Sequence, residues 1–343
     1  MKKIDVNLFN KKVKVVNGCT MFLKNKSDYL KCRRFLDEYK VDYLNLKISN
    51  YYLINVFDET LKEWIENKEL TFKRTESISL ENGYLATKNY KEKSIIKVND
   101  IEIGNGRPVF IAGPCSVEKE DTLREIAIKV KESGADVLRG GAFKPRTSPY
   151  EFQGLGKEGV DILYKIGKEL DMPVITEILD VRDLDYMIDK VDILQVGTRN
   201  MYNYPLIKEL GKVDKPILLK RGLSASVKEF LLSAEYIMLE GNEKVILCER
   251  GIRNYDTATR NIMDIATIAL LKELSHLPII SDPSHATGKR TLISPMVDSS
   301  ISAGADGVII ETCNNPDAAW SDGKQSICPK ELQSIINRHK KFK

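Results

Sequence analysis

Short apolar runs, each followed by a segment of helix length, repeat along the chain from residue 107 onward. Runs that are apolar throughout are typical of parallel strands covered on both faces. Eight such runs alternating with helices favour a closed (β/α)8 TIM barrel over an open sheet, so an α/β fold is expected. The eight runs are Val109–Gly113, Val137–Gly141, Val174–Ile178, Ile193–Gly197, Ile217–Arg221, Val245–Glu249, Ile279–Asp282 and Val308–Glu311.

The first hundred residues follow a different pattern. Segments with strand character alternate with segments of helical period, which predicts a small α+β unit with an antiparallel sheet. The strand-like segments are Val13–Leu23, Val41–Ser49 and Tyr51–Phe57, and the helix-like ones are Asp28–Tyr39 and Glu59–Asn67.

Composition changes at the same place. All twelve prolines and nineteen of the twenty-one glycines lie after residue 100, whereas half of the fourteen tyrosines lie before it. We therefore expect two domains, a small α+β domain with its linker at 1–94 and a barrel at 95–343. Ile95–Ile103 is expected to form a strand or hairpin that leads into the barrel.

Charge and cysteine usage narrow the class of protein. Net charge is +4, but residues 1–100 hold 20 Lys and Arg against 14 Asp and Glu, and positive charges are scattered among acids. A nucleic-acid partner is therefore not expected. No apolar stretch approaches the ~20 residues of a membrane span, and Met1–Asn10 lacks the core of a signal peptide. Six cysteines without a CxxC pair favour a reduced, cytoplasmic location.

Cationic side chains gather where the predicted strands end. In a barrel, chemistry collects at the carboxyl ends of the strands. Cations meeting at one mouth repel one another unless anionic ligands bind there, and Arg suits carboxylate and phosphate. Taken singly, each could instead cap a helix or pair with a neighbouring acid. The cationic residues at or just after the predicted strand ends are Arg139, Lys144, Arg199, Lys220 and Arg250.

A second set combines a thiol, an imidazole and two carboxylates. Cys115, His285 and Glu311 follow or end predicted strands, and Asp322 lies in a loop. Such a mixed S/N/O set suits Mn, Fe, Co or Zn rather than Mg. Taken alone, Cys115 fits a small buried core residue and His285 a loop residue, so only their shared location at barrel ends favours a metal site.

Several segments closely resemble one enzyme family. They are IAGPCSVE (111–118), LRGGAFKPRTSPYEFQGLG (138–156), LLKRG (218–222), LCERGIRNYD (247–256), SDPSHATG (281–288) and SDGKQS (321–326). Over residues 95–340 the chain resembles 3-deoxy-D-arabino-heptulosonate 7-phosphate (DAHP) synthase, which opens the shikimate pathway to chorismate and the aromatic amino acids. It is similar to the microbial subgroup related to 3-deoxy-D-manno-octulosonate 8-phosphate (KDO8P) synthase. Lys144–Thr147 reads Lys-Pro-Arg-Thr, as in DAHP synthases, where the other family has a Lys-Ala-Asn-Arg type of sequence.

The resemblance implies roles for individual residues. One divalent metal ion (Mn, Fe, Co or Zn) would be held by Cys115, His285, Glu311 and Asp322. The phosphoenolpyruvate site would consist of Arg139, Lys144, Arg199, Lys220 and Arg250. The phosphate of erythrose 4-phosphate would be bound by Arg146 and Thr147. One departure is Cys313, where close relatives often have His.

The implied reaction condenses phosphoenolpyruvate with erythrose 4-phosphate and water to give DAHP and inorganic phosphate. Lys144 and Glu177 are the candidates for positioning the water and moving its proton, and activation by the metal is an alternative that stays open. KDO8P synthase, which uses arabinose 5-phosphate, is the enzyme alternative, and a catalytically silent barrel is the alternative from another class.

The resemblance also suggests a role for the N-terminal domain. Some enzymes of this subgroup carry an all-helical chorismate mutase there, and others a ferredoxin-like domain that mediates feedback inhibition by Tyr or Phe. Because the segment has strand character, the ferredoxin-like domain is expected, and a structural or oligomerisation domain is the alternative. The family suggests a homotetramer or homodimer.

Overall fold

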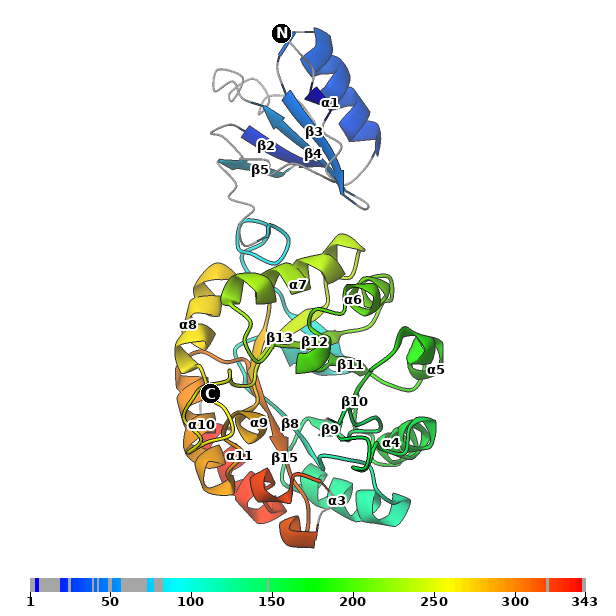
Figure 1. Ribbon diagram of the computed structural model, residues 1–343, viewed down its shortest axis with the longest axis vertical. Coiled ribbons are helices and arrows are strands. Elements are labelled where there is room, and N and C mark those ends of the chain that lie inside the picture. The colour runs from blue at the N-terminus through cyan, green and yellow to red at the C-terminus, as the bar shows by residue number, and fades with distance from the viewer. Residues whose placement is uncertain are drawn as a thin grey trace.

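The computed structural model describes two folded parts joined by a linker (Figure 1). The described residues are 4–5, 19–23, 26–38, 40–41, 43–48, 51–56, 73–76, 83–146, 148–318 and 321–340. The predicted helix Glu59–Asn67 lies outside them, as does residue 147.

Eight parallel strands close into a barrel, as the apolar runs predicted. The last strand pairs with the first, Gly307 opposite Val109 and Glu311 opposite Gly113, so the sheet has no free edge. Each strand is buried along almost its whole length. The strands are β8 (Val109–Gly113), β9 (Val137–Arg139), β10 (Val174–Glu177), β11 (Ile193–Val196), β12 (Ile217–Lys220), β13 (Val245–Glu249), β14 (Ile279–Ser281) and β15 (Gly307–Glu311).

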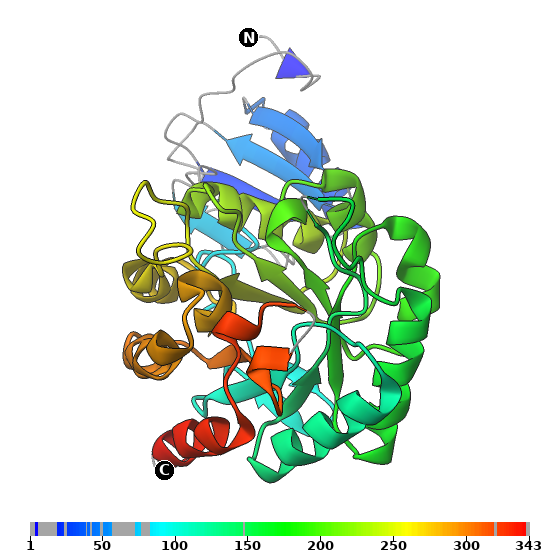
Figure 2. The same ribbon diagram turned by 60° about the horizontal axis from the view of Figure 1, so that its bottom comes forward.

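Helices surround the strands, and the last helix lies beside α3 to complete the ring (Figure 2). Their apolar faces pack on the sheet, and caps fix their ends; Ser226 and Glu229, for example, form a capping box at the start of α7. The helices are α3 (Glu120–Glu132), α4 (Lys157–Glu169), α5 (Leu184–Met187), α6 (Tyr204–Leu210), α7 (Val227–Leu239), α8 (Ile265–Leu274), α9 (Pro283–Thr287), α10 (Arg290–Ser302) and α11 (Pro329–His339). Short 3₁₀ turns are Val181–Asp183, Thr198–Asn200, Pro316–Ala318 and Gly323–Gln325.

The expected hairpin before the barrel is present. β6 (Ile96–Val98) and β7 (Ile101–Ile103) pair antiparallel. Ile96, Val98 and Ile103 are buried in one apolar cluster with residues of all eight barrel strands, among them Val109, the first residue of β8. The hairpin therefore packs against the barrel interior from the amino ends of the strands, opposite their carboxyl ends.

The N-terminal part has the strand order of a split βαβ unit. Its elements are β1 (Ile4–Asp5), β2 (Cys19–Leu23), α1 (Lys26–Glu38), β3 (Tyr43–Ile48), β4 (Tyr51–Val56) and β5 (Lys73–Glu76). The sheet order is β1-β3-β4-β2-β5, and β4 pairs antiparallel with both β2 and β3. The βαβ connection through α1 therefore straddles β4, as in ferredoxin-like folds.

A buried carboxylate anchors the linker to the barrel. Both Glu235 oxygens, on α7, accept backbone N–H groups, from Tyr84 at 3.0 Å, Leu85 at 2.9 Å and Ala86 at 2.8 Å. Just before them Gly83 has φ +83°, and a Cβ there would lie 2.7 Å from Glu235 Oε2. We call Glu235 and these three amides the linker clasp. The domain boundary at 94/95 stays a prediction.

Helices long and apolar enough to cross a lipid bilayer are absent from the residues that the structure describes.

Candidate active site

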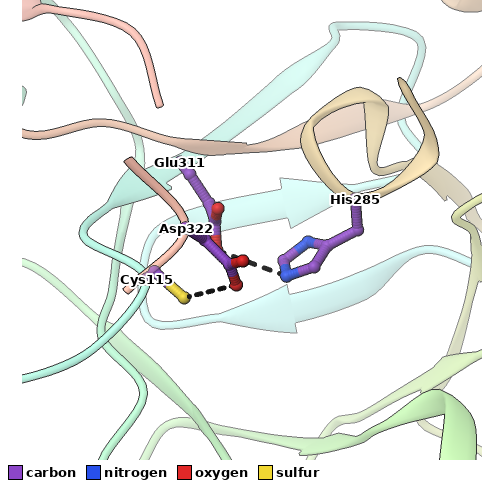
Figure 3. Close-up of side chains that lie close together, drawn as sticks. All are labelled: Cys115, His285, Glu311 and Asp322. Atoms are coloured by element: carbon purple, nitrogen blue, oxygen red, sulfur yellow. Dashed lines mark hydrogen bonds and ion pairs between the residues drawn. The ribbon is translucent and has the colours of Figure 1, made fainter. Parts of the chain in front are cut away.

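Strand register gathers the four predicted metal ligands at the barrel mouth (Figure 3). Glu311 pairs with Gly113, so Cys115, two residues further on, lies next to it. His285 lies on α9 directly after β14, and the Ser284 hydroxyl accepts the Glu311 N–H at 3.0 Å, which ties α9 to β15. With Asp322 they form a group in which one ligand atom from each residue lies within 4.8 Å of the others.

Contacts inside the group leave one buried carboxylate oxygen without a hydrogen bond. The Cys115 thiol donates to Asp322 Oδ2 at 3.2 Å, and His285 Nε2 lies 3.2 Å from Glu311 Oε1. Glu311 is fully buried, and its Oε1 accepts no hydrogen bond from the described residues, although Arg139 Nη2 lies 3.3 Å away as an ion-pair partner. A buried carboxylate oxygen without a donor is costly unless a cation binds it. The four residues therefore fit a divalent metal of the Mn, Fe, Co or Zn type.

Protonation at this group depends on what binds there. Burial, together with the Glu311 charge, raises the pKa of the Cys115 thiol to about 12, although the Lys144 ammonium, 2.9 Å from Sγ, opposes the rise. Burial likewise acts to raise the pKa of Glu311, but the charges of His285 and Arg139 outweigh it and hold that pKa below its usual value. The thiol thus carries its proton at neutral pH, and a metal ion that binds there would have to displace that proton.

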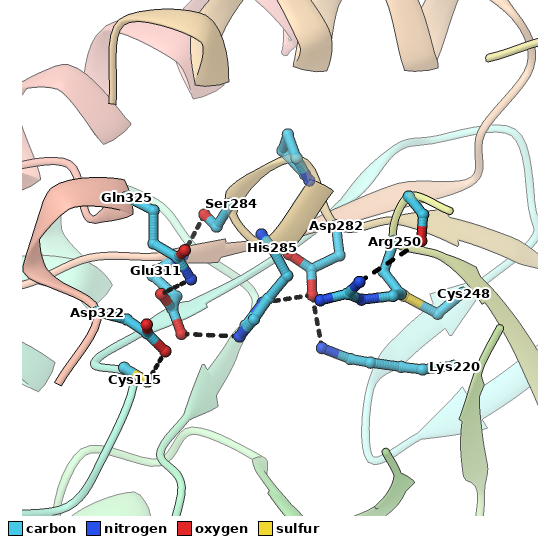
Figure 4. A network of polar contacts seen from close by, with 12 residues as sticks. Cys115, Lys220, Cys248, Arg250, Asp282, Ser284, His285, Glu311, Asp322 and Gln325 are labelled. Carbon is cyan, nitrogen blue, oxygen red and sulfur yellow. Dashed lines mark hydrogen bonds and ion pairs between the residues drawn. The ribbon is translucent and has the colours of Figure 1, made fainter. Parts of the chain in front are cut away.

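Asp282 orients the histidine ligand, a role that its sequence position alone did not indicate. Its Oδ1 caps α9 by accepting the His285 N–H at 3.0 Å, and its Oδ2 lies 2.7 Å from His285 Nδ1 and 2.6 Å from Lys220 Nζ (Figure 4). Burial opposes ionisation, but the charges of His285 and Lys220 hold the pKa of Asp282 well below its ordinary value. A carboxylate on the far nitrogen fixes the tautomer of a metal-binding histidine.

We call Cys115, His285, Glu311 and Asp322 the metal group. A cavity of about 480 Å³ lies beside it, and the wall of this cavity is strongly cationic. Eight Arg and Lys side chains face it, against the carboxylates of Glu151, Glu177 and Asp322. Arg139 is buried, and its Nη1 has no partner among the described residues. Such a wall is stable when it binds anions. The cations are Arg139, Lys144, Arg146, Arg199, Lys220, Arg250, Arg253 and Arg260.

Glu177 lies on the same wall at the end of β10. Its Oε2 accepts a hydrogen bond from Gln195 at 3.2 Å. Burial raises the pKa of Glu177, although the charges of Lys144, Lys220 and Arg199 oppose the rise. A Cβ on Gly197 would lie 1.9 Å from Glu177 Oε1, so the glycine makes room for this carboxylate. A carboxyl with a raised pKa near bound anions is suited to proton transfer.

Arg146 lines the rim of the cavity on the loop after β9. Its Nε donates to the Phe152 carbonyl at 3.1 Å, which leaves the Nη groups of the guanidinium available for a ligand. Thr147, the other residue expected to bind the erythrose 4-phosphate phosphate, lies outside the described residues.

A buried ion network stands behind two of the wall cations. Arg221 Nη1 lies 2.9 Å from both Glu249 Oε2 and Asp264 Oδ2. The other oxygen of Glu249 accepts the Gly251 N–H at 2.7 Å. Because Arg221 follows Lys220 and Glu249 precedes Arg250, this network fixes the backbone from which both cations project. We call Arg221, Glu249 and Asp264 the arginine brace.

Sequence reasoning missed several residues that take part in the site. Arg253 and Arg260 line the cavity, and Gln325 contacts Glu311. Arg253 and Gln325, like Asp282, belong to segments that carry the family resemblance, which was the available signal. Arg253 and Arg260 lie beyond the predicted strand ends where cations were sought, and the role of Gln325 depends on a contact with Glu311 that only the fold creates.

Comparisons with known proteins identify the family of the chain. The DAHP synthetase I family matches residues 83–343. A phospho-2-dehydro-3-deoxyheptonate aldolase from Thermotoga maritima is 47% identical over 253 residues, which cover 74% of this chain and 75% of that protein. A 2-dehydro-3-deoxyphosphooctonate aldolase from Francisella tularensis subsp. holarctica is 27% identical over 262 residues, covering 71% of this chain and 94% of that protein.

Solved structures extend the similarity to almost the whole chain. The crystal structure of the Thermotoga maritima DAHP synthase superimposes with a TM-score of 0.75 at 38% identity and covers 95% of this chain and 97% of that one. A truncated form of the Thermotoga maritima synthase gives a TM-score of 0.70 at 42% identity and covers 75% of this chain and 95% of that one. The chain belongs to the DAHP synthetase I family.

Proposed function

We propose that this chain is a metal-dependent DAHP synthase whose reaction takes place in the cationic cavity at the barrel mouth. The observation that carries the proposal is the position of that cavity directly beside the group Cys115, His285, Glu311 and Asp322. The reaction joins phosphoenolpyruvate, erythrose 4-phosphate and water into DAHP and inorganic phosphate. Both substrates are anions, as the cavity wall requires.

The wall cations hold phosphoenolpyruvate at its two charged ends. Arg139, Lys144 and Lys220 bind the carboxylate, and Arg199, Lys220 and Arg250 bind the phosphate. The unpartnered Nη1 of Arg139 supports its place in this set. Arg146, with Thr147, binds the phosphate of the aldose at the rim. With the phosphate of the aldose bound at the rim, its aldehyde end would point toward Cys115, His285, Glu311 and Asp322, where a bound metal would act as a Lewis acid on a carbonyl oxygen.

In the carbon–carbon bond-forming step, C3 of phosphoenolpyruvate attacks the aldehyde carbon and positive charge develops at C2. The aldehyde oxygen takes up a proton and becomes the C4 hydroxyl, while water adds to C2 and gives up one proton to a group of the enzyme. The resulting hemiketal phosphate then breaks the bond between C2 and the phosphate-bearing oxygen. Its C2 hydroxyl loses a proton and becomes the ketone as inorganic phosphate leaves. Glu177 and Lys144 are the residues proposed to position the water and move its proton, because both line the cavity beside the anion site.

For the N-terminal unit, the proposed role is feedback control by Tyr or Phe, in a cytoplasmic homotetramer or homodimer. The split βαβ strand order supports the assignment to a ferredoxin-like domain, and the strands do not fit an all-helical mutase.

Phosphate release from phosphoenolpyruvate tests the activity directly. We expect turnover with erythrose 4-phosphate, little with arabinose 5-phosphate, loss on treatment with EDTA, and recovery with added Mn²⁺. A preference for arabinose 5-phosphate would show that the chain catalyses the KDO8P synthase reaction instead. Turnover that persists in EDTA would show that the reaction does not require a metal ion.

A further inference from the structure

A buried glutamine bridges a wall cation and one of the carboxylates of the metal group. Gln325 is 3% exposed. Its Nε2 donates to Glu311 Oε2 at 2.7 Å (Figure 4), and its Oε1 accepts from Arg260 Nη1 at 2.9 Å. The same Arg260 nitrogen lies 3.4 Å from Asp322 Oδ1. One guanidinium therefore contacts Asp322 directly and Glu311 through a single amide.

The orientation of that amide is fixed by its two neighbours. A side-chain amide has one accepting oxygen and one donating nitrogen, while a guanidinium only donates and a carboxylate only accepts. Turning Gln325 over would place its NH₂ against Arg260 and its oxygen against Glu311, so both contacts would become repulsive. The amide thus has one favourable orientation, which presents a single oxygen of Glu311, Oε1, to the centre of the group.

Arg260 reaches this place from the loop between β13 and α8. Ile252 and Ile262 exchange two backbone hydrogen bonds, of 2.9 and 3.0 Å, that close the loop into a small hairpin. The Arg260 N–H also bonds to the Thr287 carbonyl at 2.9 Å. Gly288 leaves space for the arginine stem, because a Cβ there would lie 2.7 Å from Arg260 Cβ. The loop that carries Arg250 and Arg253 on the substrate side therefore ends on the metal group.

From these contacts we infer that Arg260 and Gln325 are positioning residues that hold Glu311 and Asp322 in the arrangement that binds the metal. The inference rests on the proposed metal site. Gln325 does not line the cavity, so its contribution passes through its contacts with Glu311 and Arg260. Partners of this kind typically contribute a factor of ~10–100 to metal affinity.

Electrostatics makes the expected result distinctive. Arg260 is a cation beside a cation site, so removing its charge would by itself strengthen metal binding. Loss of positioning would weaken it. Loss of the Arg260 charge and loss of positioning therefore change metal affinity in opposite directions. Weaker Co²⁺ binding in Arg260→Met would show that the loss of positioning outweighs the loss of charge repulsion.

The experiment measures Co²⁺ binding to metal-free full-length protein, in competition with a chelator of known affinity. Absorption from the Cys115 thiolate–Co²⁺ bond reports occupancy, and its absence in Cys115→Ala identifies the band. We expect Gln325→Met and Arg260→Met each to weaken Co²⁺ binding by ~10–100-fold. The double variant should lose less than the product of the two, because both changes break the same chain of contacts.

Arg253→Met is the matched control. Arg253 belongs to the same loop and lines the same cavity, so this change removes an equal charge at a side chain that, within the described part of the chain, forms no hydrogen bond or ion pair with the four ligands. It should leave Co²⁺ affinity unchanged or slightly higher. For Gln325→Met at saturating Co²⁺, the KM for phosphoenolpyruvate should stay at the wild-type value.

Two results would overturn the inference in different ways. Wild-type affinity in Gln325→Met, with the thiolate band intact in the wild type, would remove the positioning role and leave the metal site standing. If the wild-type protein shows no thiolate–Co²⁺ band, both the proposed metal site and the positioning role of Gln325 and Arg260 are refuted. Thermal unfolding of the metal-free variants within a few degrees of wild type excludes general loss of fold as the cause of weaker binding.

Discussion

At the scale of single residues, Glu177 combines two properties that are separable by experiment. Its carboxylate faces three cations of the wall, so it helps to balance their charge. Burial raises its pKa nonetheless, which suits a group that exchanges a proton with water. A balancing carboxylate affects how tightly phosphoenolpyruvate binds, whereas a proton-transfer group affects the chemical step.

We predict that Glu177→Gln lowers kcat by ~10²–10⁴-fold while the KM for phosphoenolpyruvate changes little. Steady-state kinetics at saturating metal make the measurement. Gly197→Ala, whose Cβ would displace the same carboxylate, should lower kcat in the same direction. A raised KM with kcat preserved would assign Glu177 to charge balance instead.

How much of the site was predictable depends on what makes each residue functional. Cys115, His285 and Glu311 could be found because their chemistry is carried by their residue types at strand ends. Asp282 and Gln325 could not be singled out, because an aspartate or glutamine acquires its role only when the fold places a histidine or a carboxylate 2.7 Å away.

At the scale of elements, the arginine brace joins two strands and a helix behind the cation wall. Arg221 extends β12, Glu249 ends β13, and Asp264 caps α8 by accepting the Thr267 N–H at 3.0 Å. Burial opposes ionisation of Asp264, but the hydrogen bonds from Thr267 and Arg221 outweigh it and lower its pKa. The stabilisation from this carboxylate is therefore present above the pKa of an unfolded aspartate and is lost as pH falls through the lower folded value.

We predict that Asp264→Asn lowers the free energy of unfolding by about 1.5–3 kcal/mol at pH 7, since the helix cap is kept but the charged hydrogen bond to Arg221 is lost. The gap between wild type and variant should narrow as pH falls below about 4, where the unfolded wild-type carboxylate takes up its proton. Denaturant unfolding across a pH series measures both curves. A gap that stays constant with pH would show that the Asp264 charge contributes nothing.

The sequence pattern predicted the number and order of the barrel strands correctly, but it placed the carboxyl ends of several strands one or two residues too late. All eight apolar runs form barrel strands, but six residues at their ends lie beyond the strand bounds: Gly140, Gly141, Ile178, Gly197, Arg221 and Asp282. Apolar periodicity marks burial, and these residues are buried or partly buried at the mouth without belonging to the ladder. In the N-terminal part, strands β3 and β4 and helix α1 lie within two residues of their expected bounds, while the order of strands in that sheet was not readable from local pattern.

At the scale of the whole molecule, the two parts meet through one buried apolar cluster. Tyr51 and Leu53 of β4 belong to the same cluster as Tyr84 and Leu85 of the linker and residues of the barrel helices. The family match begins at Gly83, where the linker clasp begins. The barrel with its clasp is therefore the unit that should work alone.

We predict that Tyr or Phe inhibits the full chain and does not inhibit a chain that starts at Gly83. The shortened chain should keep metal-dependent phosphate release. The same assay with and without each amino acid at millimolar concentration compares the two chains. Inhibition that persists after truncation would place the effector site in the barrel, and a full-length enzyme insensitive to both amino acids would leave the N-terminal unit with a structural role.

The linker clasp also limits how far the N-terminal unit can travel. β5 ends at Glu76 and Tyr84 is held by Glu235, so only eight peptide steps join the two anchored points. A fully extended chain of that length spans about 25–30 Å, less than the width of a barrel with its helices. Any rearrangement of the unit is thus a short swing about a fixed pivot on α7. The end of β5 therefore stays within that distance of Tyr84 and cannot reach the far side of its own barrel.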